Sequence, residues 1–357
     1  MILEMSTTAI ATALTQIEQE RRRAERNALA KTLALGAGAL LLGILFAILQ
    51  GWRFSRAIRH LTQIAGEVGR GNLQAKAKPT TNDEIGVLCE RFNDMTGRIE
   101  TLLVENMAKA VLDKELERAT AIQAQLMPPR DVFDFEGLCY CGVCESATQV
   151  GGDWWHHYQL GPGRVLLCIG DVTGHGIPSA MLTASAKACC DTVIRNDPEF
   201  RLSRFMSLLD YTIREAGKGE LVMTFFAGLF DTRKMVVEYA NAGHNFPLLV
   251  RQGSMIYLKA RGCRLGDGGE FESEKTELLP GDLVAFYTDG IIECEDPART
   301  EYGMKRFRHR LLQPLKSMGV DAIRDNIMAD AFAFYADMPR QDDVTLVVAR
   351  VSGSAAT

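Results

Sequence analysis

The sequence lacks several features that would assign it to common classes of protein. It has no long run of basic residues, and its net charge of −5 comes from 40 Lys and Arg mixed with 45 Asp and Glu. This balance argues against nucleic acid as the main partner. At 357 residues the chain is also too long for one ordinary core, so at least two folded units are expected.

The cysteines lack the spacing of a disulfide framework or of a zinc finger. All nine are scattered irregularly, and Cys189 and Cys190 are adjacent, which is typical of reduced cytoplasmic thiols. Residues 139–144, "CYCGVC", suggest zinc binding at first, but no second pair of Cys or His residues stands at finger spacing. Their alternation of small and apolar residues predicts a strand instead.

One apolar stretch, residues 32–52, contains no charged side chain. As a helix it is long enough to cross a hydrocarbon layer of about 30 Å. It starts too far from Met1 for a usual signal peptide, and it ends in Gln-Gly-Trp-Arg rather than at a small-residue cleavage site. We therefore predict a single membrane span. Basic residues flank both of its ends, so they leave the orientation open.

The segment before the span, residues 1–31, is polar, helix-prone and too short for a sensor domain. The stimulus is then sensed elsewhere, or by a part upstream of the chain as given.

Apolar residues recur at alternating intervals of four and three in two stretches after the span. They are Phe54, Ile58, Leu61, Ala65 and Val68, and then Ile85, Leu88, Phe92, Met95, Ile99 and Leu102. This spacing predicts two helices with coiled-coil seams, joined by a non-helical connector that contains Gly, Asn and Pro. Neither seam is long enough to be stable alone, so we expect them to pack together in a homodimer.

These two helices, with "NDEIG" opening the second, resemble a HAMP signal-relay domain over residues 53–104. The sequence departs from the family at Ala57, where a proline often stands. The resemblance implies that the C-terminal part lies in the cytoplasm, and hence that the chain is a single-pass protein of the bacterial inner membrane. A plain amphipathic hairpin is the alternative.

A helical linker is predicted over residues 105–129, ending at Pro128 and Pro129. Its seam comprises Leu112, Leu116, Ala119, Gln123 and Leu126. This seam is out of phase with the one before it, so the linker is suited to transmitting a rotation or a change of register.

Residues 130–352 change to short β-rich runs separated by Gly, Pro, Asp or Asn. The runs are "GRVLLCIGD", "VMTFFAGLF", "MVVEYANAG", "FPLLVR", "MIYLKA", "DLVAFYTDG" and "DVTLVVARV". Helices are expected at 177–195, 200–216 and about 319–336. Antiparallel connections with helices in separate blocks predict an α+β layered domain.

Aspartates stand at four of the predicted strand ends. Asp153 and Asp171 each follow a glycine, Asp289 follows "DLVAFYT", and the pair Asp342 and Asp343 precedes the last strand. If these ends lie together, the carboxylates repel one another unless cations neutralise them. Oxygen ligands without Cys or His select Mg²⁺ or Mn²⁺ over Ca²⁺, and several carboxylates suit two ions about 3.5–4 Å apart that activate a water. The alternative is that each Asp caps a turn.

Five motifs in order carry a second resemblance: "VGGDWW", "GDVTGHGIPSAMLT", "NAGHNFPLLV", "LLPGDLVAFYTDGIIE" and "QDDVTLVV". Over about 130–351 they resemble the PPM (type 2C) metal-dependent protein serine/threonine phosphatases, in particular the bacterial SpoIIE-like branch. The resemblance implies a catalytic β-sandwich flanked by helices, in αββα layers, with two Mn²⁺ or Mg²⁺ ions at one end.

The resemblance also implies roles for individual residues. Asp171 would bridge both ions, with the Val172 carbonyl as a further ligand. Asp289 and Asp342 would bind metal, and Asp153 would bind metal or orient a metal-bound water. Asp343 is the alternative to Asp342.

The implied reaction is direct attack of the activated water on phosphoserine or phosphothreonine, without a phospho-enzyme. The implied substrate is a regulatory phosphoprotein, namely a STAS-type anti-anti-sigma factor. His175 either donates a proton to the leaving oxygen or shapes the glycine turn, and His244 is expected to make a structural hydrogen bond. His156 and His157 stand where the family often has aromatic or acidic residues, which bears on the fit of the substrate.

Other classes fit less well. A catalytically inactive binding module is one alternative, and metal binding would separate it from an enzyme. A diguanylate cyclase would need an acidic residue and then Phe after Gly-Gly-Asp, where Trp154 and Trp155 stand. A histidine kinase would need a nucleotide-binding glycine motif of a type that the sequence lacks.

Overall fold

The computed structural model describes residues 2–80, 83–148, 150–174, 176–313, 318–336, 338 and 340–352, with side chains from residue 9 onward. The chain divides into two compact units, Met1–Ala110 and Val111–Thr357. Each unit is described by itself.

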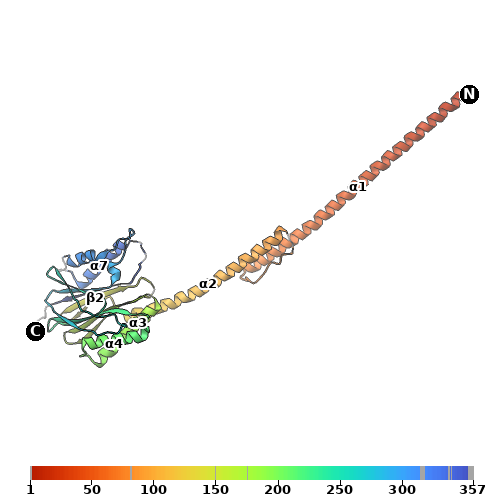
Figure 1. The fold of residues 1–357 in the computed structure, drawn as a ribbon. Coiled ribbons are helices and arrows are strands. Elements are labelled where there is room, and N and C mark those ends of the chain that lie inside the picture. Colours follow the sequence, from red (N-terminus) through yellow and green to blue (C-terminus); the bar gives the residue numbers. More distant parts are fainter. Residues whose placement is uncertain are drawn as a thin grey trace. The chain divides into compact units, whose positions relative to one another are not determined.

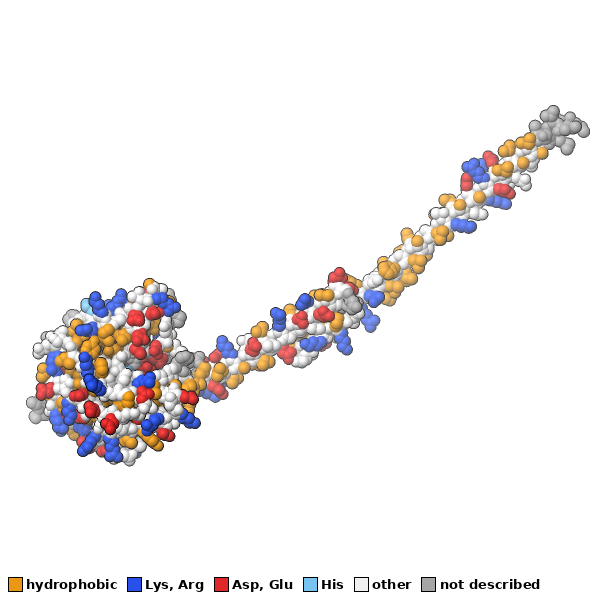
Figure 2. All heavy atoms as spheres, viewed as in Figure 1, with side chains coloured by type: hydrophobic (Ala, Val, Ile, Leu, Met, Phe, Trp, Pro, Cys, Tyr) orange, Lys and Arg blue, Asp and Glu red, His pale blue; other side chains and the backbone are white. Residues whose placement is uncertain are grey.

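The first unit is built on two long helices, α1 (Ile2–Gly69) and α2 (Glu84–Leu126), and α2 extends into the second unit (Figure 1). The predicted polar segment, apolar stretch and first HAMP helix all lie within α1, because the Gly residues there do not interrupt it. In the described part of the chain, one helix is long and apolar enough to cross a membrane, with a mean hydropathy of 2.4 over its most apolar window. Figure 2 shows apolar side chains along the visible face of this stretch.

Side-chain hydrogen bonds anchor the connector between the helices to α2, and Asn93 makes two of them. Asn93 accepts a hydrogen bond from the Ala77 N–H and donates one to the Ala77 carbonyl, each at 2.8 Å. Ala77 and Thr96 are buried there, at 1% and 0% exposure. Several seam residues stay more exposed, including Leu88 at 49% and Ile99 at 38%.

The second unit is a sandwich of two antiparallel sheets. One sheet has the strand order β1-β2-β11-β10-β7-β8 and the other β3-β4-β5-β6-β9. The strands of the first sheet are β1 (Phe133–Phe135), β2 (Leu138–Glu145), β7 (Leu248–Arg251), β8 (Ser254–Tyr257), β10 (Leu283–Tyr287) and β11 (Val344–Val351). Those of the second are β3 (Asp153–Gly161), β4 (Arg164–Val172), β5 (Met223–Asp231), β6 (Val236–Ala242) and β9 (Glu274–Glu277).

Helices cover both outer faces of the sandwich. They are α3 (Ile177–Asn196), α4 (Leu202–Gly217), α5 (Asp289–Ile292), α6 (Gly303–Leu312) and α7 (Val320–Tyr335). One apolar cluster, which includes Trp155 and Phe286, fills the space between the sheets. A second joins α3 and α4 to the β4 side, and a third joins α6 and α7 to the β11 side. Figure 1 shows α3 and α4 on one side of the sheets and α7 on the other, which confirms the αββα prediction.

The predicted strand at "CYCGVC" is confirmed as part of β2, and the three predicted helices are confirmed as α3, α4 and α7. The sequence patterns did not predict β1, β3, β9, α5 or α6. Strand β3 hides its periodicity because both of its faces are buried: Trp154 packs in the α3–α4 cluster and Trp155 between the sheets.

Candidate functional site

Two of the predicted aspartates face each other across neighbouring strands. Asp153 is the first residue of β3, and it pairs in register with Asp171, the last but one residue of β4. Cross-strand partners point to the same face of a sheet, so the two carboxylates are neighbours. Asp153 is 1% exposed, whereas Asp171 is half-buried.

Asp153 is held by two hydroxyls that come from the other sheet. Thr288 and Thr345 each donate a hydrogen bond to Asp153 Oδ2, at 2.7 and 2.6 Å, and the Thr345 N–H donates to Thr288 Oγ1 at 2.9 Å. Burial raises the pKa of Asp153 well above its usual value, the charge of Asp171 adds to this, and the two threonines oppose it. The sequence reading missed both threonines, although they belong to the "TDG" and "DDVT" motifs.

Asp171 lies within the field of the other predicted acids. Burial and, in decreasing order, the charges of Asp289, Asp342 and Asp343 together raise its pKa to about 8. Asp289 opens α5 directly after β10, and the other two immediately precede β11. Because β10 and β11 pair antiparallel, the end of one and the start of the other meet at one edge. The structure thus brings residues from four distant segments together.

The adjacent acids Asp342 and Asp343 have different surroundings. Asp343 is 6% exposed, and its carboxylate accepts hydrogen bonds from the N–H groups of Gly152 (2.6 Å), Ala147 (2.7 Å) and Asp153 (3.2 Å). Asp342 is exposed, and its Oδ1 accepts the Asp343 N–H at 2.8 Å. Asp343 therefore anchors the loop that leads into β3.

Glycines are required where the backbone approaches these oxygens. A Cβ on Gly152 would lie 2.8 Å from the Val172 carbonyl oxygen and 3.3 Å from Asp171 Oδ1. A Cβ on Gly290 would lie 1.9 Å from the Asp343 carbonyl oxygen. The Asp171 carboxylate and the Val172 carbonyl consequently lie on the same side of the "GGD" loop.

The end of α2 reaches the same loop. Gln123 is 7% exposed, and its Nε2 donates to the Gly151 carbonyl at 2.7 Å, while the Gly151 N–H donates to its Oε1 at 3.1 Å. Gly151 lies two residues before Asp153. The only sequence signal for this contact is a polar residue at a seam position.

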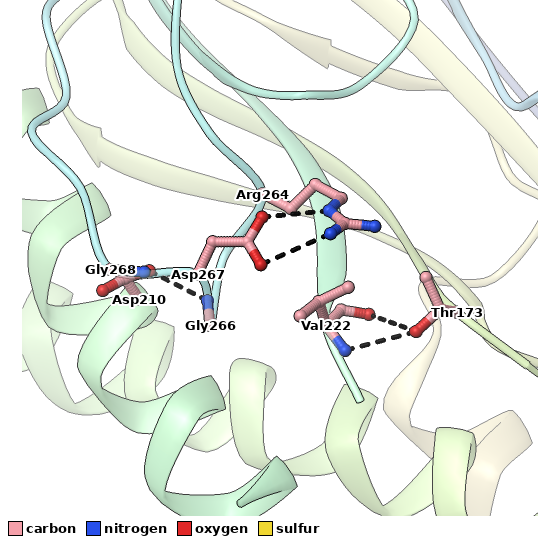
Figure 3. A network of polar contacts seen from close by, with 7 residues as sticks. All are labelled: Thr173, Asp210, Val222, Arg264, Gly266, Asp267 and Gly268. Carbon is pink, nitrogen blue, oxygen red and sulfur yellow. Dashed lines mark hydrogen bonds and ion pairs between the residues drawn. The ribbon is translucent and has the colours of Figure 1, made fainter. Parts of the chain in front are cut away.

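A second network supports the other side of the site (Figure 3). Thr173, two residues after Asp171, donates its N–H to the Val222 carbonyl at 2.9 Å, and its Oγ1 accepts the Val222 N–H at 3.2 Å. Buried Asp210 of α4 accepts the N–H groups of Gly266 and Gly268, at 2.8 and 3.2 Å. The 264–268 loop in turn pairs with the start of β5.

The histidines differ in how far the structure describes them. His175 lies outside the described residues. His244 is 6% exposed, its Nδ1 lies 2.9 Å from Thr224 Oγ1, and the Asn241 side chain holds its backbone N–H and carbonyl. Burial lowers the pKa of His244 to about 4. Thr224 pairs with Asp171 across β4 and β5, so His244 supports a neighbour of the site, as a structural role requires.

His156 and His157 both lie on β3 and stack on each other. Burial lowers the pKa of each to about 4. His157 also lies 2.9 Å, by its Nδ1, from the Tyr140 hydroxyl.

Within the described ranges, no three His, Cys, Asp or Glu side chains converge closely enough to enclose a metal ion. The carboxylates share one edge of the sandwich without forming a closed ligand set. Their donor chemistry, carboxylate and carbonyl oxygen without thiolate or imidazole, nevertheless fits hard divalent cations.

Comparisons with known proteins agree with this architecture. Residues 161–352 match the family model for Stage II sporulation protein E (SpoIIE), and residues 49–101 match the HAMP domain. Protein IcfG of Synechocystis is 25% identical over 322 residues, which is 81% of this chain and 50% of IcfG. Phosphoserine phosphatase RsbU of Bacillus subtilis is 26% identical over 247 residues, 67% of this chain and 70% of RsbU. The chain thus spans about half the length of IcfG.

Solved structures share the fold. The SiaA-PP2C domain of Pseudomonas aeruginosa superposes with a TM-score of 0.61 at 20% identity, covering 69% of this chain and 99% of that domain. The RsbU and RsbW domains of Rv1364c from Mycobacterium tuberculosis give 0.53 at 24% identity, with 62% and 63% covered. The second unit therefore has the PP2C fold.

Proposed function

Because this chain belongs to the SpoIIE family of PP2C-type phosphatases and carries a HAMP domain, we propose that it is a membrane-anchored protein serine/threonine phosphatase. Its substrate is phosphoserine or phosphothreonine on a regulatory protein of the STAS-type anti-anti-sigma class. The observation that carries the proposal is the meeting of Asp153, Asp171, Asp289 and Asp342 at one edge of the sandwich. The name of RsbU, a phosphoserine phosphatase, supports the same reaction.

In this proposal Asp171, Asp289 and Asp342 hold two Mn²⁺ or Mg²⁺ ions, together with the Val172 carbonyl. Asp342 suits the ligand role better than Asp343, because three backbone N–H groups already occupy the carboxylate of Asp343. When bound, such ions supply an activated water and neutralise the phosphoryl oxygens.

The chain itself supplies position. The hydroxyls of Thr288 and Thr345 fix the Asp153 carboxylate opposite Asp171, and Asp343 fixes the backbone at Gly152. A buried carboxylate held by hydroxyls and backbone keeps its place through the reaction, so little reorganisation is needed when charge develops on the phosphoryl group.

Regulation acts through α2 in this proposal. The paired hydrogen bonds between Gln123 and Gly151 connect the helical linker to the loop that carries Asp153. A shift of α2 breaks or restores these bonds, so a HAMP-driven change in a homodimer controls the geometry of the site. The HAMP domain supports a cytoplasmic location for the catalytic part in this proposal.

The test is phosphate release from a phosphoserine peptide by the full chain in detergent, with Mn²⁺, with Mg²⁺ and with chelator. Release is expected only with metal, and Asp289→Asn is expected to abolish it. The matched control is Asp134→Asn, because Asp134 is exposed on β1. Metal binding measured by calorimetry, without turnover, would favour the inactive binding module. Release that persists with chelator would contradict the metal-dependent mechanism.

A further inference from the structure

Two pockets of opposite charge adjoin on the side of the sandwich that carries α5, α6 and α7. The acidic pocket, about 300 Å³, is lined by residues that include Gly290, Glu293, Glu301 and Asp342. Through Asp342 it opens at the edge of the sandwich where the proposed catalytic aspartates meet, which we call the catalytic edge. The basic pocket, about 600 Å³, is lined by residues that include Lys305, Arg306, His309 and Phe334. The first pocket joins the proposed site through Asp342, whereas none of the four aspartates lines the second.

The basic pocket carries more positive than negative charge, with Asp330 as its single acidic residue among the described lining residues. Residues 305–310, "KRFRHR", hold four Lys or Arg and one His without an acid. Arg310 pairs with Asp330 at the pocket wall. Lys305 and Arg306 are exposed and make no ion pair within the described part of the chain, and the Arg306 guanidinium lies 4.1 Å from the centre of the Phe334 ring. This stacking holds a cation at the pocket mouth.

One buried side chain separates the two pockets. The Tyr302 N–H donates to the carbonyl of Cys294, which lines the acidic pocket, at 2.8 Å. The Tyr302 hydroxyl donates to Asp330 Oδ2, in the basic pocket, at 2.7 Å. Figure 2 shows Lys and Arg side chains along the edge of the body where α7 lies, with acidic side chains next to them. The two pockets therefore lie on either side of Tyr302.

The chemistry of the basic pocket selects carboxylates. An arginine fork binds a carboxylate through two parallel hydrogen bonds, and the adjacent lysine and histidine add donors. The pocket is concave, which suits separate side chains of a peptide better than a flat bilayer surface. We propose that it binds a carboxylate-rich segment of the phosphoprotein substrate, which places the phosphorylated residue at the catalytic edge. This inference rests on the proposed phosphatase function and adds the means of docking.

The docking is tested first by binding, which needs no turnover. The probe is a fluorescent peptide of eight glutamates and no phosphate, added to the full chain in nanodiscs of phosphatidylcholine. The variant Lys305→Gln/Arg306→Gln removes two exposed charges, and the control Arg195→Gln/Arg261→Gln removes two exposed charges elsewhere in the same unit. The pocket variant is expected to weaken binding about fivefold, as for exposed charge pairs, and the control less than twofold.

Turnover is then measured with two phosphoserine peptides that differ only in a flanking run of Glu or of Gln. The wild type is expected to hydrolyse the Glu peptide with a lower KM and an unchanged kcat, and the pocket variant is expected to lose this preference. Hydrolysis of p-nitrophenyl phosphate, which has no flanking segment, is expected to be equal in all three proteins.

Several results would overturn the docking proposal. These are equal loss of peptide binding in both double variants, an unchanged Glu preference in the pocket variant, or binding of phosphatidylserine vesicles that depends on Lys305 and Arg306 while peptide binding does not, which would assign the pocket to the membrane. Glutamate-peptide binding that depends on the pocket, without hydrolysis of any phosphorylated substrate, would refute the phosphatase function and leave an acidic-peptide site.

Discussion

The two units of this chain differ in how far their apolar side chains are exposed. In the first unit Leu41 is 66% exposed and Ile99 is 38% exposed, whereas in the second Trp154 and Phe226 are each at 0%. Exposed apolar surface on this scale marks contact with another partner. The second unit buries its apolar residues within a single chain, whereas we propose that the first buries them in a bilayer around α1 and in a second copy along the seams.

The two ends of helix α2 differ in exposure in the same way. Near its start, Leu88 is 49% exposed on a seam, and near its end Gln123 is 7% exposed and packs against the loop that leads into β3. A helix that is exposed at one end and hydrogen-bonded at the other suits a signal relay. A change in the contacts of the exposed end shifts the helix, and the shift alters the hydrogen bonds at the other end.

Breaking the bonded end is expected to have the largest effect. Gln123→Leu keeps the bulk of the side chain and removes both hydrogen bonds to Gly151, which leaves two buried backbone groups unpaired at a cost of about 1–3 kcal/mol each. We expect kcat on a phosphoserine peptide to fall roughly tenfold or more, since 1.4 kcal/mol corresponds to tenfold.

The neighbouring Gln125→Leu provides the control, because Gln125 is exposed on the same helix. If both substitutions change activity equally, the contact with Gly151 has no part in controlling the site.

The helices and strands that could be predicted are those with a clear period. Helix α4, with Leu202, Phe205, Leu209 and Ile213 buried along one stripe, is such a case. Helix α6 was missed because its basic residues leave only Phe307 and Leu311 as buried positions. Strand register and layer order depend on contacts between distant segments, and the periodicity of one segment does not predict these contacts.

The candidate site, too, could be predicted only in part from the sequence. The motifs predicted the aspartates, because carboxylates gathered at strand ends repel one another unless they bind a cation. They could not separate Asp342 from Asp343, because adjacent acids differ only in burial and bonding once the chain is folded. The supports from Thr288, Thr345 and Gln123 cross more than one layer of the fold, and no local pattern reports them.

Breaking the exposed end is expected to have a smaller effect on the catalytic unit. Ile99→Asp places a charge on the seam, where a homodimer would have to bury it. We expect the dissociation constant of the dimer to rise at least about tenfold, a change of 1.4 kcal/mol, measured by light scattering of the full chain in detergent. The thermal unfolding of the second unit should not change.

Thr101→Asp is the matched control, because Thr101 is exposed, two residues away and off the seam. A dimer that tolerates Ile99→Asp as well as Thr101→Asp would remove the seam from the interface.

The smallest expected effect concerns the buried His244 of the second unit. Burial holds the pKa of His244 at about 4, against the usual 6.5 of a histidine, so the unfolded chain takes up a proton below pH 6.5 while the folded chain does not until about pH 4. The stabilisation from neutral His244 is therefore complete above pH 6.5 and is lost as the pH falls towards 4, by at most about 3 kcal/mol. His244→Gln should flatten the fall in unfolding temperature over this window, followed by tryptophan fluorescence. The same substitution should leave dimer dissociation unchanged at every pH, because His244 lies in the self-sufficient unit; a parallel loss of dimer would show that the two units are not as independent as their burial indicates.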